Sequence, residues 1–374
     1  MSIRGVAHIA GIFEHPTRHA KDKSVAQLHG EVAAGALADA GLTLDDVDGY
    51  FCAGDAPGLG PLSMIEYMGL RNVRHMDATD VGGSSYVLHI GHAAPAIAMG
   101  KCNVALITLA GRPRAEGMAT GTKPRNYGTD LPDAPFEYMY GPTVVNMYAM
   151  AAHRHMHEYG TTSEQLAWIK VAASHHAQHN PHAMLRKVVT VEDVVNSRII
   201  CKPLHLLDCC VETDNATCII VTSLDRARDG AQRAAVIQSV AGRVCKPRAD
   251  MHYQHGPIST VAGHYAKDIL WPNAGVGPDH IDVTGSYDAF TFTSMLQLED
   301  YGFCKKGEGG GYVSSGIIDL GGGRPNNTSG GHLCEGYTHG MSMVIENVRQ
   351  LRGEADDSCP IGRDGKRQHT YDHA

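Results

Sequence analysis

Two short segments of the chain combine glycines with side chains that can carry protons. One is residues 282–291, Asp-Val-Thr-Gly-Ser-Tyr-Asp-Ala-Phe-Thr, with Tyr287 near its centre. The other is residues 335–340, Glu-Gly-Tyr-Thr-His-Gly, with Tyr337 two residues before a histidine. It follows an Asn-Asn-Thr-Ser-Gly-Gly run at 326–331. A phenol has a reference pKa of about 10, and its surroundings can tune it to act as an acid or a base. Both tyrosines are therefore candidates for acid–base chemistry.

A third polar turn, residues 80–85, has no thiol. It reads Asp-Val-Gly-Gly-Ser-Ser and precedes an apolar stretch of small residues, and no cysteine lies between Cys52 and Cys102. A thiolate nucleophile is therefore absent from this turn. We expect Ser84 and Ser85 to cap the following helix and to offer hydroxyl or N–H donors to a substrate, with a serine nucleophile as the alternative.

The remaining metal-ligating residue types show no ligand pattern. The ten cysteines are scattered without a Cys-x-x-Cys pair, which argues against a structural zinc site in this chain. Four histidines cluster at residues 175–182, and we expect them to be structural or solvated. The glycine runs at 307–311 and 321–323 lack the phosphate-loop pattern, so we expect tight turns there.

Composition places the chain among ordinary globular proteins. Its 374 residues, 43% of them hydrophobic and 19% charged, suffice for one large domain or two fused domains. A net charge of -8 with no long basic run argues against a nucleic-acid partner. No apolar stretch reaches roughly 18 residues and the first residues lack the apolar core of a signal peptide, so we expect no membrane association and a cytoplasmic location.

Strand and helix patterns alternate along both halves of the chain. The first half predicts strands at 3–13, 47–51 and 104–109 and helices at 24–40 and 86–99. The second half predicts strands at 234–244 and 281–283 and helices at 260–270 and 292–301. This alternation is typical of layered α/β folds with βαβ connections. We expect two similar halves, 1–228 and 229–374, with an insertion at about 112–202 in the first.

These motifs together resemble the thiolase superfamily, from residue 3 to about residue 353. Thiolases of the sterol carrier protein type carry Asn-x-Ser-Gly-Gly followed by Gly-His-Pro-x-Gly, and here Tyr337 stands in place of that histidine. Tyr287 fills the slot of a histidine or asparagine in the family's other active-site turn. The segment 203–217, Pro-Leu-His-Leu-Leu-Asp-Cys-Cys followed by Asp-Asn-Ala-Thr, is similar to a third family signature.

The resemblance implies a fold and a reaction. The fold is an α/β thiolase fold of duplicated βαβ halves in five layers, α-β-α-β-α, with a loop domain inserted at about 112–202 that covers an acyl-CoA. The family's nucleophilic cysteine belongs near residues 80–85 and is missing. The family's last Cys-x-Gly turn is missing too, with no such motif after Cys359. With tyrosines in both catalytic slots, the chain resembles the lipid-transfer-type aldolases that cleave steroid side chains.

Such an aldolase splits a β-hydroxyacyl-CoA thioester into a ketone and a shorter acyl-CoA. The resemblance implies that Tyr287 and Tyr337 are the catalytic acid–base pair; Tyr337 is favoured as the base and Tyr287 as the proton donor, with the order open. Ser84, Ser85, His332 and His339 are candidate substrate-binding residues. No metal and no cofactor beyond the CoA of the substrate are expected.

Two other functions stay open, a thiolase-like acyltransferase and a non-catalytic acyl-CoA- or lipid-binding subunit. The missing cysteine weighs against the former, and paired ionisable phenols weigh against the latter. The resemblance also implies a homodimer formed through sheet edges, and a small OB-fold, zinc-ribbon partner protein. Two chains of each kind would make a heterotetramer.

Overall fold

A mixed six-stranded sheet organises the first half of the chain. The computed structural model describes residues 3–119, 143–228, 230–242, 257–354 and 374. The strand order is β3-β2-β4-β7-β1-β8, where the strands are β1 (Ala7–Glu14), β2 (Gly49–Phe51), β3 (His75–Asp77), β4 (Val104–Gly111), β7 (Asn215–Ser223) and β8 (Ala235–Val236). β2 runs parallel to β3 and β4, whereas β7 runs antiparallel to both β4 and β1. The predicted α/β class is confirmed.

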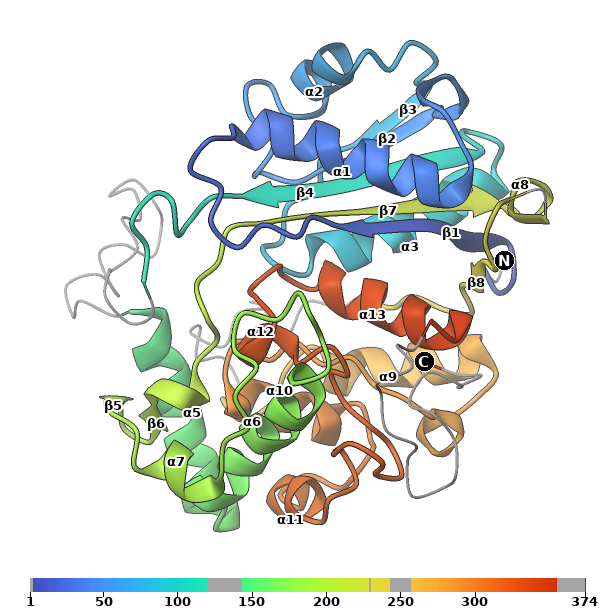
Figure 1. The fold of residues 1–374 in the computed structure, drawn as a ribbon. Coiled ribbons are helices and arrows are strands. Elements are labelled where there is room, and N and C mark those ends of the chain that lie inside the picture. Colours follow the sequence, from blue (N-terminus) through green and yellow to red (C-terminus); the bar gives the residue numbers. More distant parts are fainter. Residues whose placement is uncertain (1–2, 120–142, 229, 243–256, 355–373) are drawn as a thin grey trace.

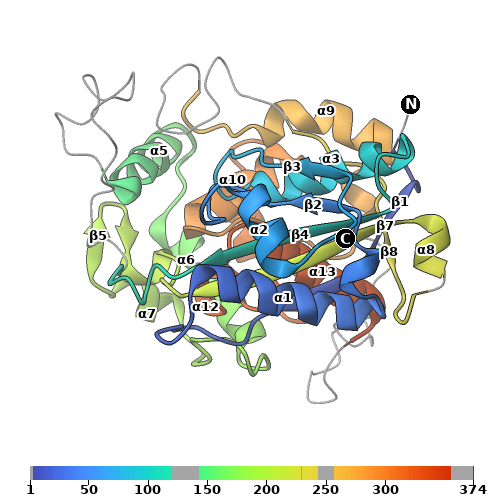
Figure 2. The same cartoon turned by 90° about the horizontal axis from the view of Figure 1, so that it is seen from above.

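Helices cover both faces of this sheet. Helices α1 (Val25–Ala40) and α2 (Pro61–Met68) lie on one face, seen from above in Figure 2, and α3 (Ser85–Ala98) and α13 (Met341–Arg352) lie on the other (Figure 1). Successive side chains of a strand point to opposite faces. Accordingly, Leu106 of β4 packs in the core beneath α1, and its neighbour Ile107 packs in the core with α3 and α13.

Local sequence signals set the limits of α1. The Ser24 hydroxyl accepts a hydrogen bond from the Gln27 N–H, and the Gln27 side chain accepts one from the Ser24 N–H in return. This capping box satisfies two donors that the first turn leaves unpaired. The helix ends at Gly41, whose φ of 70° is left-handed. The helix predicted for residues 24–40 is confirmed.

A second, helical body is built from described residues of the inserted segment and of the second half. Its core is built around α6 and α10, where Ile169 and Leu166 pack with Phe292 and Met295. Its helices are α5 (Val144–Tyr159), α6 (Ser163–Ala177), α7 (Val191–Val195), α9 (Gly263–Ala274), α10 (Thr291–Asp300), α11 (Gly309–Ser314) and α12 (Gly331–Cys334). A two-stranded ribbon, β5 (Ile199–Cys201) and β6 (Leu204–His205), lies beside them, and the short α8 (Leu224–Arg228) follows β7.

The second half departs from the strand pattern predicted for it. Within the described residues of the predicted strand 234–244, only β8 forms, and it joins β1 of the first sheet. Residues 281–283 belong to no strand; the adjacent Thr284 makes an isolated bridge with Asn326. The predicted helices at 260–270 and 292–301 are present as α9 and α10.

The tight turn predicted for the glycine run at 307–311 is present only at Gly307, whose φ of 87° is left-handed. Gly309 to Gly311 begin α11 instead. Their missing side chains allow close packing, because a Cβ on Gly309 would lie 2.8 Å from Met295 Cγ and one on Gly310 would lie 2.7 Å from Gln165 Cδ. The buried Glu299 carboxylate accepts hydrogen bonds from the N–H groups of Gly307 and Gly309. Among the described residues, no helix has the length and apolar character needed to cross a membrane.

Candidate active site

The two tyrosines predicted to share a site are in direct contact. The Tyr287 and Tyr337 hydroxyls share a hydrogen bond of 2.7 Å, although the residues are 50 positions apart. The Tyr287 hydroxyl also lies 3.0 Å from Nδ1 of His339. Three groups that can hold a proton therefore form a connected chain of hydrogen bonds.

Tyr287 is positioned by α10 and by the asparagine run before α12. The Gln297 side chain accepts from the Tyr287 N–H at 3.0 Å and donates to the Tyr287 carbonyl at 2.8 Å. The Asn327 side chain does the same for Ser286, at 2.8 and 3.0 Å. Asn327 itself has a left-handed φ of 54°, a conformation that asparagine tolerates better than most residues. Two amide side chains thus fix the turn on both sides of the phenol.

Tyr337 is positioned by the start of β7 and by the loop after β1. Its N–H donates to the Thr213 hydroxyl at 2.9 Å, and its carbonyl accepts from the Asn215 side chain at 2.6 Å. The Arg18 Nε donates to the Glu335 carbonyl at 3.1 Å. The sequence did not point to these supporting residues individually, although Asn215 falls in the third family signature.

A buried aspartate–histidine pair lies directly behind the phenols. The Asp288 carboxylate accepts from the backbone N–H groups of His332 and Leu333, and the His332 Nδ1 lies 3.4 Å from Asp288 Oδ1. The His332 Nε2 donates to the His339 carbonyl at 2.6 Å. Burial raises the pKa of Asp288 to about 6 and lowers the pKa of His332 to about 4. His332 is therefore a neutral ring at pH 7, and it braces the loop that carries His339.

The predicted role of His332 as a substrate contact stays a prediction. Its ring packs edge-on against Tyr287, with centroids 4.8 Å apart, and lies 4.9 Å from the Tyr337 ring. His332 is fully buried, whereas His339 is partly exposed and touches the Tyr287 hydroxyl. His339 also stacks on Tyr86 of α3, a wall of the site that the sequence did not point to.

Burial raises the pKa of Tyr287 well above its usual value, and the neighbouring Tyr337 raises it further. Tyr287 therefore holds its proton at neutral pH. It can donate that proton to an acceptor in the site, but a free phenolate at this position is disfavoured.

The turn at 80–85 faces the phenols through Gly83. The Ser85 hydroxyl donates to the Gly82 carbonyl at 2.6 Å and accepts from the Val81 N–H at 2.9 Å, and its side chain is buried. Ser84 is exposed and precedes α3, but its side chain makes no capping bond, so the predicted cap is wrong at this residue. A substrate contact through either serine stays a prediction.

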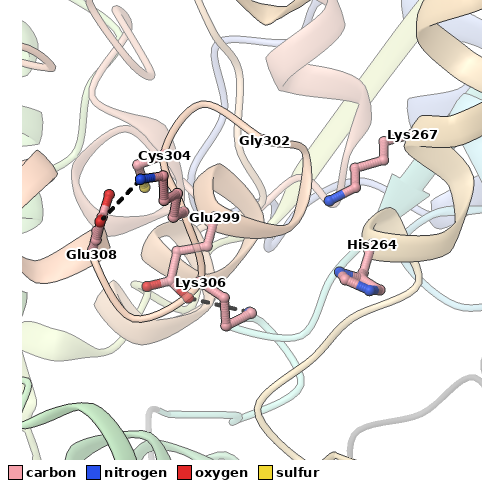
Figure 3. Close-up of a pocket in the computed structure, with 8 residues that line it drawn as sticks. His264, Lys267, Glu299, Gly302, Cys304, Lys306 and Glu308 are labelled. Atoms are coloured by element: carbon pink, nitrogen blue, oxygen red, sulfur yellow. Dashed lines mark ion pairs between the residues drawn. The ribbon is translucent and has the colours of Figure 1, made fainter.

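A pocket of about 520 Å³ lies apart from the tyrosines, between α9 and the loop after α10 (Figure 3). His264 and Lys267 reach it from α9, and Lys306 enters from the loop. Lys306 lies 3.2 Å from Glu299 and 2.7 Å from Asp300, so part of its charge is neutralised inside the protein. Neither catalytic candidate lines this pocket. Within the described ranges, no group of three or more potential ligands is placed to hold a metal ion.

Comparison with known proteins finds thiolase relatives. The thiolase C-terminal domain-like family model matches residues 251–361. The chain is 36% identical to the 17-hydroxy-3-oxo-4-pregnene-20-carboxyl-CoA lyase of Mycobacterium tuberculosis, over 94% of this chain and 92% of that protein. It is 33% identical to a steroid side-chain-cleaving aldolase of Thermomonospora curvata, over 93% of this chain and 91% of that protein.

Solved structures show the same relationship. The Ltp2-ChsH2(DUF35) aldolase superposes with a TM-score of 0.86 at 32% identity, covering 94% of this chain and 91% of that chain. Human mitochondrial 3-ketoacyl-CoA thiolase superposes with a TM-score of 0.67 at 13% identity, covering 94% of this chain and 93% of that chain. The second similarity is one of fold alone, and it confirms the predicted thiolase fold.

Proposed function

We propose that this chain, which belongs to the thiolase superfamily with the steroid side-chain-cleaving aldolases, catalyses retro-aldol cleavage of a β-hydroxyacyl-CoA thioester. The products are a ketone, which keeps the β carbon, and a shorter acyl-CoA, which keeps the α carbon and the thioester. The observation that carries the proposal is the 2.7 Å hydrogen bond between the Tyr287 and Tyr337 hydroxyls, opposite a turn without a thiol. CoA thioesters of steroid side chains are the first substrates to examine, because relatives that match over most of their length are named for cleaving steroid side chains or a pregnene carboxyl-CoA.

The paired phenols can carry the reaction as a proton relay. The β-hydroxyl gives its proton to the Tyr337 oxygen while Tyr337 passes its own proton to Tyr287. The bond between the α and β carbons breaks, the β carbon becomes a ketone carbonyl, and its electron pair stays on the thioester as an enolate. Tyr287 gives its own proton to the enolate carbon as it takes the proton from Tyr337, so each phenol carries one proton throughout. No free phenolate accumulates, in keeping with the raised pKa of Tyr287.

The acyltransferase alternative needs a nucleophile that takes the acyl group. Residue 83, at the centre of the turn facing the phenols, is a glycine, and the Ser85 hydroxyl is engaged within its own turn. A non-catalytic binding subunit would need neither phenol. The retro-aldol reaction uses both tyrosines and needs no acyl-enzyme. It therefore explains both the paired phenols and the missing thiol, whereas neither alternative explains both.

Tyr287→Phe and Tyr337→Phe test the proposal. Each removes one hydroxyl and keeps the ring, so we expect kcat to fall by roughly 10²-fold with little change in KM. The assay quantifies ketone and shortened acyl-CoA formed from β-hydroxyacyl-CoA thioesters. Tyr67→Phe, at an exposed position on α2, is the control and keeps full activity. Near-normal kcat in both site variants would refute the assignment.

We further propose that the chain forms a homodimer and works with a small OB-fold, zinc-ribbon partner, as two copies of each. The similar solved structure is named for two proteins, Ltp2 and ChsH2, which supports a heteromeric assembly. Strand β3 lies at one end of the sheet order, and the exposed Met76 lies on it. An open sheet edge with exposed apolar side chains favours pairing with a second copy.

Size-exclusion chromatography with light scattering, with and without co-expressed partner, tests this assembly. A monomeric mass would contradict the dimer. Full cleavage activity from the isolated chain would contradict the need for a partner.

A further inference from the structure

We infer that Gly83 is a positioning residue that fixes the reaction class of this site, because the Tyr287 ring occupies the space that a side chain at residue 83 would need. The inference deepens the proposed function and rests on it for its catalytic consequence. The steric conflict between a side chain at residue 83 and the Tyr287 ring can be tested independently of any reaction.

The geometry of the conflict is direct. A Cβ built on Gly83 would lie 2.7 Å from both Cε2 and Cζ of the Tyr287 ring and still closer to the hydroxyl. Carbon atoms that are not bonded to each other pack at about 3.5–4.0 Å, so neither ring contact is possible without movement. The φ of Gly83 is not in the left-handed region, so backbone strain does not explain the glycine. The glycine is required by the phenol in front of it.

Neither partner is free to move away. The Tyr287 hydroxyl is held by Tyr337 and His339, and its backbone is clamped on both sides by Gln297. On the other side of the contact, the Gly83 carbonyl accepts from the Gly340 N–H at 3.0 Å. A side chain at residue 83 would therefore displace the phenol from its hydrogen-bonded chain rather than be accommodated beside it.

The consequence is that two chemistries exclude each other here. A nucleophilic cysteine at residue 83 and a proton-donating phenol at residue 287 would need the same volume. With Tyr287 in place, residue 83 cannot carry a side chain, so covalent catalysis from this position is lost. Changing Gly83 to cysteine alone cannot convert this site to acyl transfer, because the phenol blocks the thiol.

A double-mutant cycle tests the shared volume. We expect Gly83→Ala to lower Tm by roughly 2–6 °C, in line with the cost of overpacking a filled site. In a Tyr287→Ala background, the same substitution should lower Tm by far less, because the ring is gone. Gly311→Ala is the matched control, since a Cβ there meets open space within a helix and should leave Tm equal or higher. Equal losses of Tm from Gly83→Ala in both backgrounds would overturn the inference.

Activity provides the second measurement. We expect Gly83→Ala to lower kcat by roughly 10²-fold with KM little changed, as in Tyr287→Phe, and to cause little further loss in the Tyr287→Phe background. Full kcat in Gly83→Ala would overturn the positioning role. If Gly83→Ala alone does not fold, recovery of folding in the Tyr287→Ala background supports the same conflict, and failure there contradicts it. If Tyr287→Phe keeps full kcat, the proposed reaction fails while the stability cycle still decides whether the two residues compete for space.

Discussion

Glu335 is predicted to make the stability of this protein fall as the pH rises. Its carboxyl is fully buried two residues before Tyr337, where it accepts a hydrogen bond from Asn180 at 2.8 Å. Burial and the nearby Glu14 raise its pKa from 4.5 to about 8, against the opposing effect of Arg18. The folded state therefore holds this proton more tightly than the unfolded chain does. The stabilisation is complete below pH 4.5 and is lost as the pH rises through 8.

The size of the effect follows from the two pKa values. Between pH 6 and pH 9, a carboxyl with a pKa of 4.5 unfolded and about 8 folded lowers the free energy of unfolding by roughly 3 kcal/mol. Glu335→Gln keeps the shape and the acceptor for Asn180 but has no titrating proton. We therefore expect the free energy of unfolding of Glu335→Gln, relative to that of the wild type, to rise by roughly 3 kcal/mol between pH 6 and pH 9.

Urea unfolding of both proteins at pH 6, 7, 8 and 9 measures this difference. Glu308→Gln is the matched control, because it removes an exposed carboxylate and should track the wild type at every pH. A constant difference between wild type and Glu335→Gln from pH 6 to pH 9 would refute the assigned burial effect.

Three further predictions concern the chemistry and its support. Intact-mass measurement after mixing with substrate should show no covalent adduct, and acylation of a serine in the turn at 80–85 would favour acyl transfer. Thr213→Val leaves the buried Tyr337 N–H without its 2.9 Å acceptor, so the free energy of unfolding should fall by about 1–3 kcal/mol and kcat should fall with it; unchanged values would contradict this support. Lys306→Met removes a cation 3.2 Å from the buried Glu299 and should cost roughly 3 kcal/mol in urea unfolding, whereas a neutral effect would contradict the pairing.

The sequence predicted the elements that follow local rules. The capping box at Ser24 and the left-handed Gly41 delimit α1, and the run at 104–109, apolar except for Thr108, identified a strand covered on both faces. The meeting of Tyr287 and Tyr337 was predicted only through the resemblance to a family, since nothing local brings together residues 50 positions apart.

The rest depended on tertiary contacts that carry no local signal. Gly309 and Gly310 lie at the start of a helix where Met295 and Gln165 leave no room for side chains, a fact invisible in the run itself. Thr213 and Asn215 support Tyr337 from a strand far away in the chain. The short Ile-Asp-Val segment at 281–283 predicts a strand, but pairing needs a partner at the right distance, and only a single bridge forms at Thr284 among the described residues.

The Tyr337 loop leads directly into α13. The catalytic site is therefore complete only when this helix has packed onto the sheet. Helix α13 begins at Met341, immediately after the Gly340 N–H bonds to Gly83, and its Ile345 and Val348 complete the core on one face of the sheet. During synthesis, a chain that ends before this loop leaves that apolar face open and has only one of its two phenols. We expect such a species to be inactive and prone to association until α13 covers the sheet. In refolding, activity should appear together with the burial of α13 and never ahead of it.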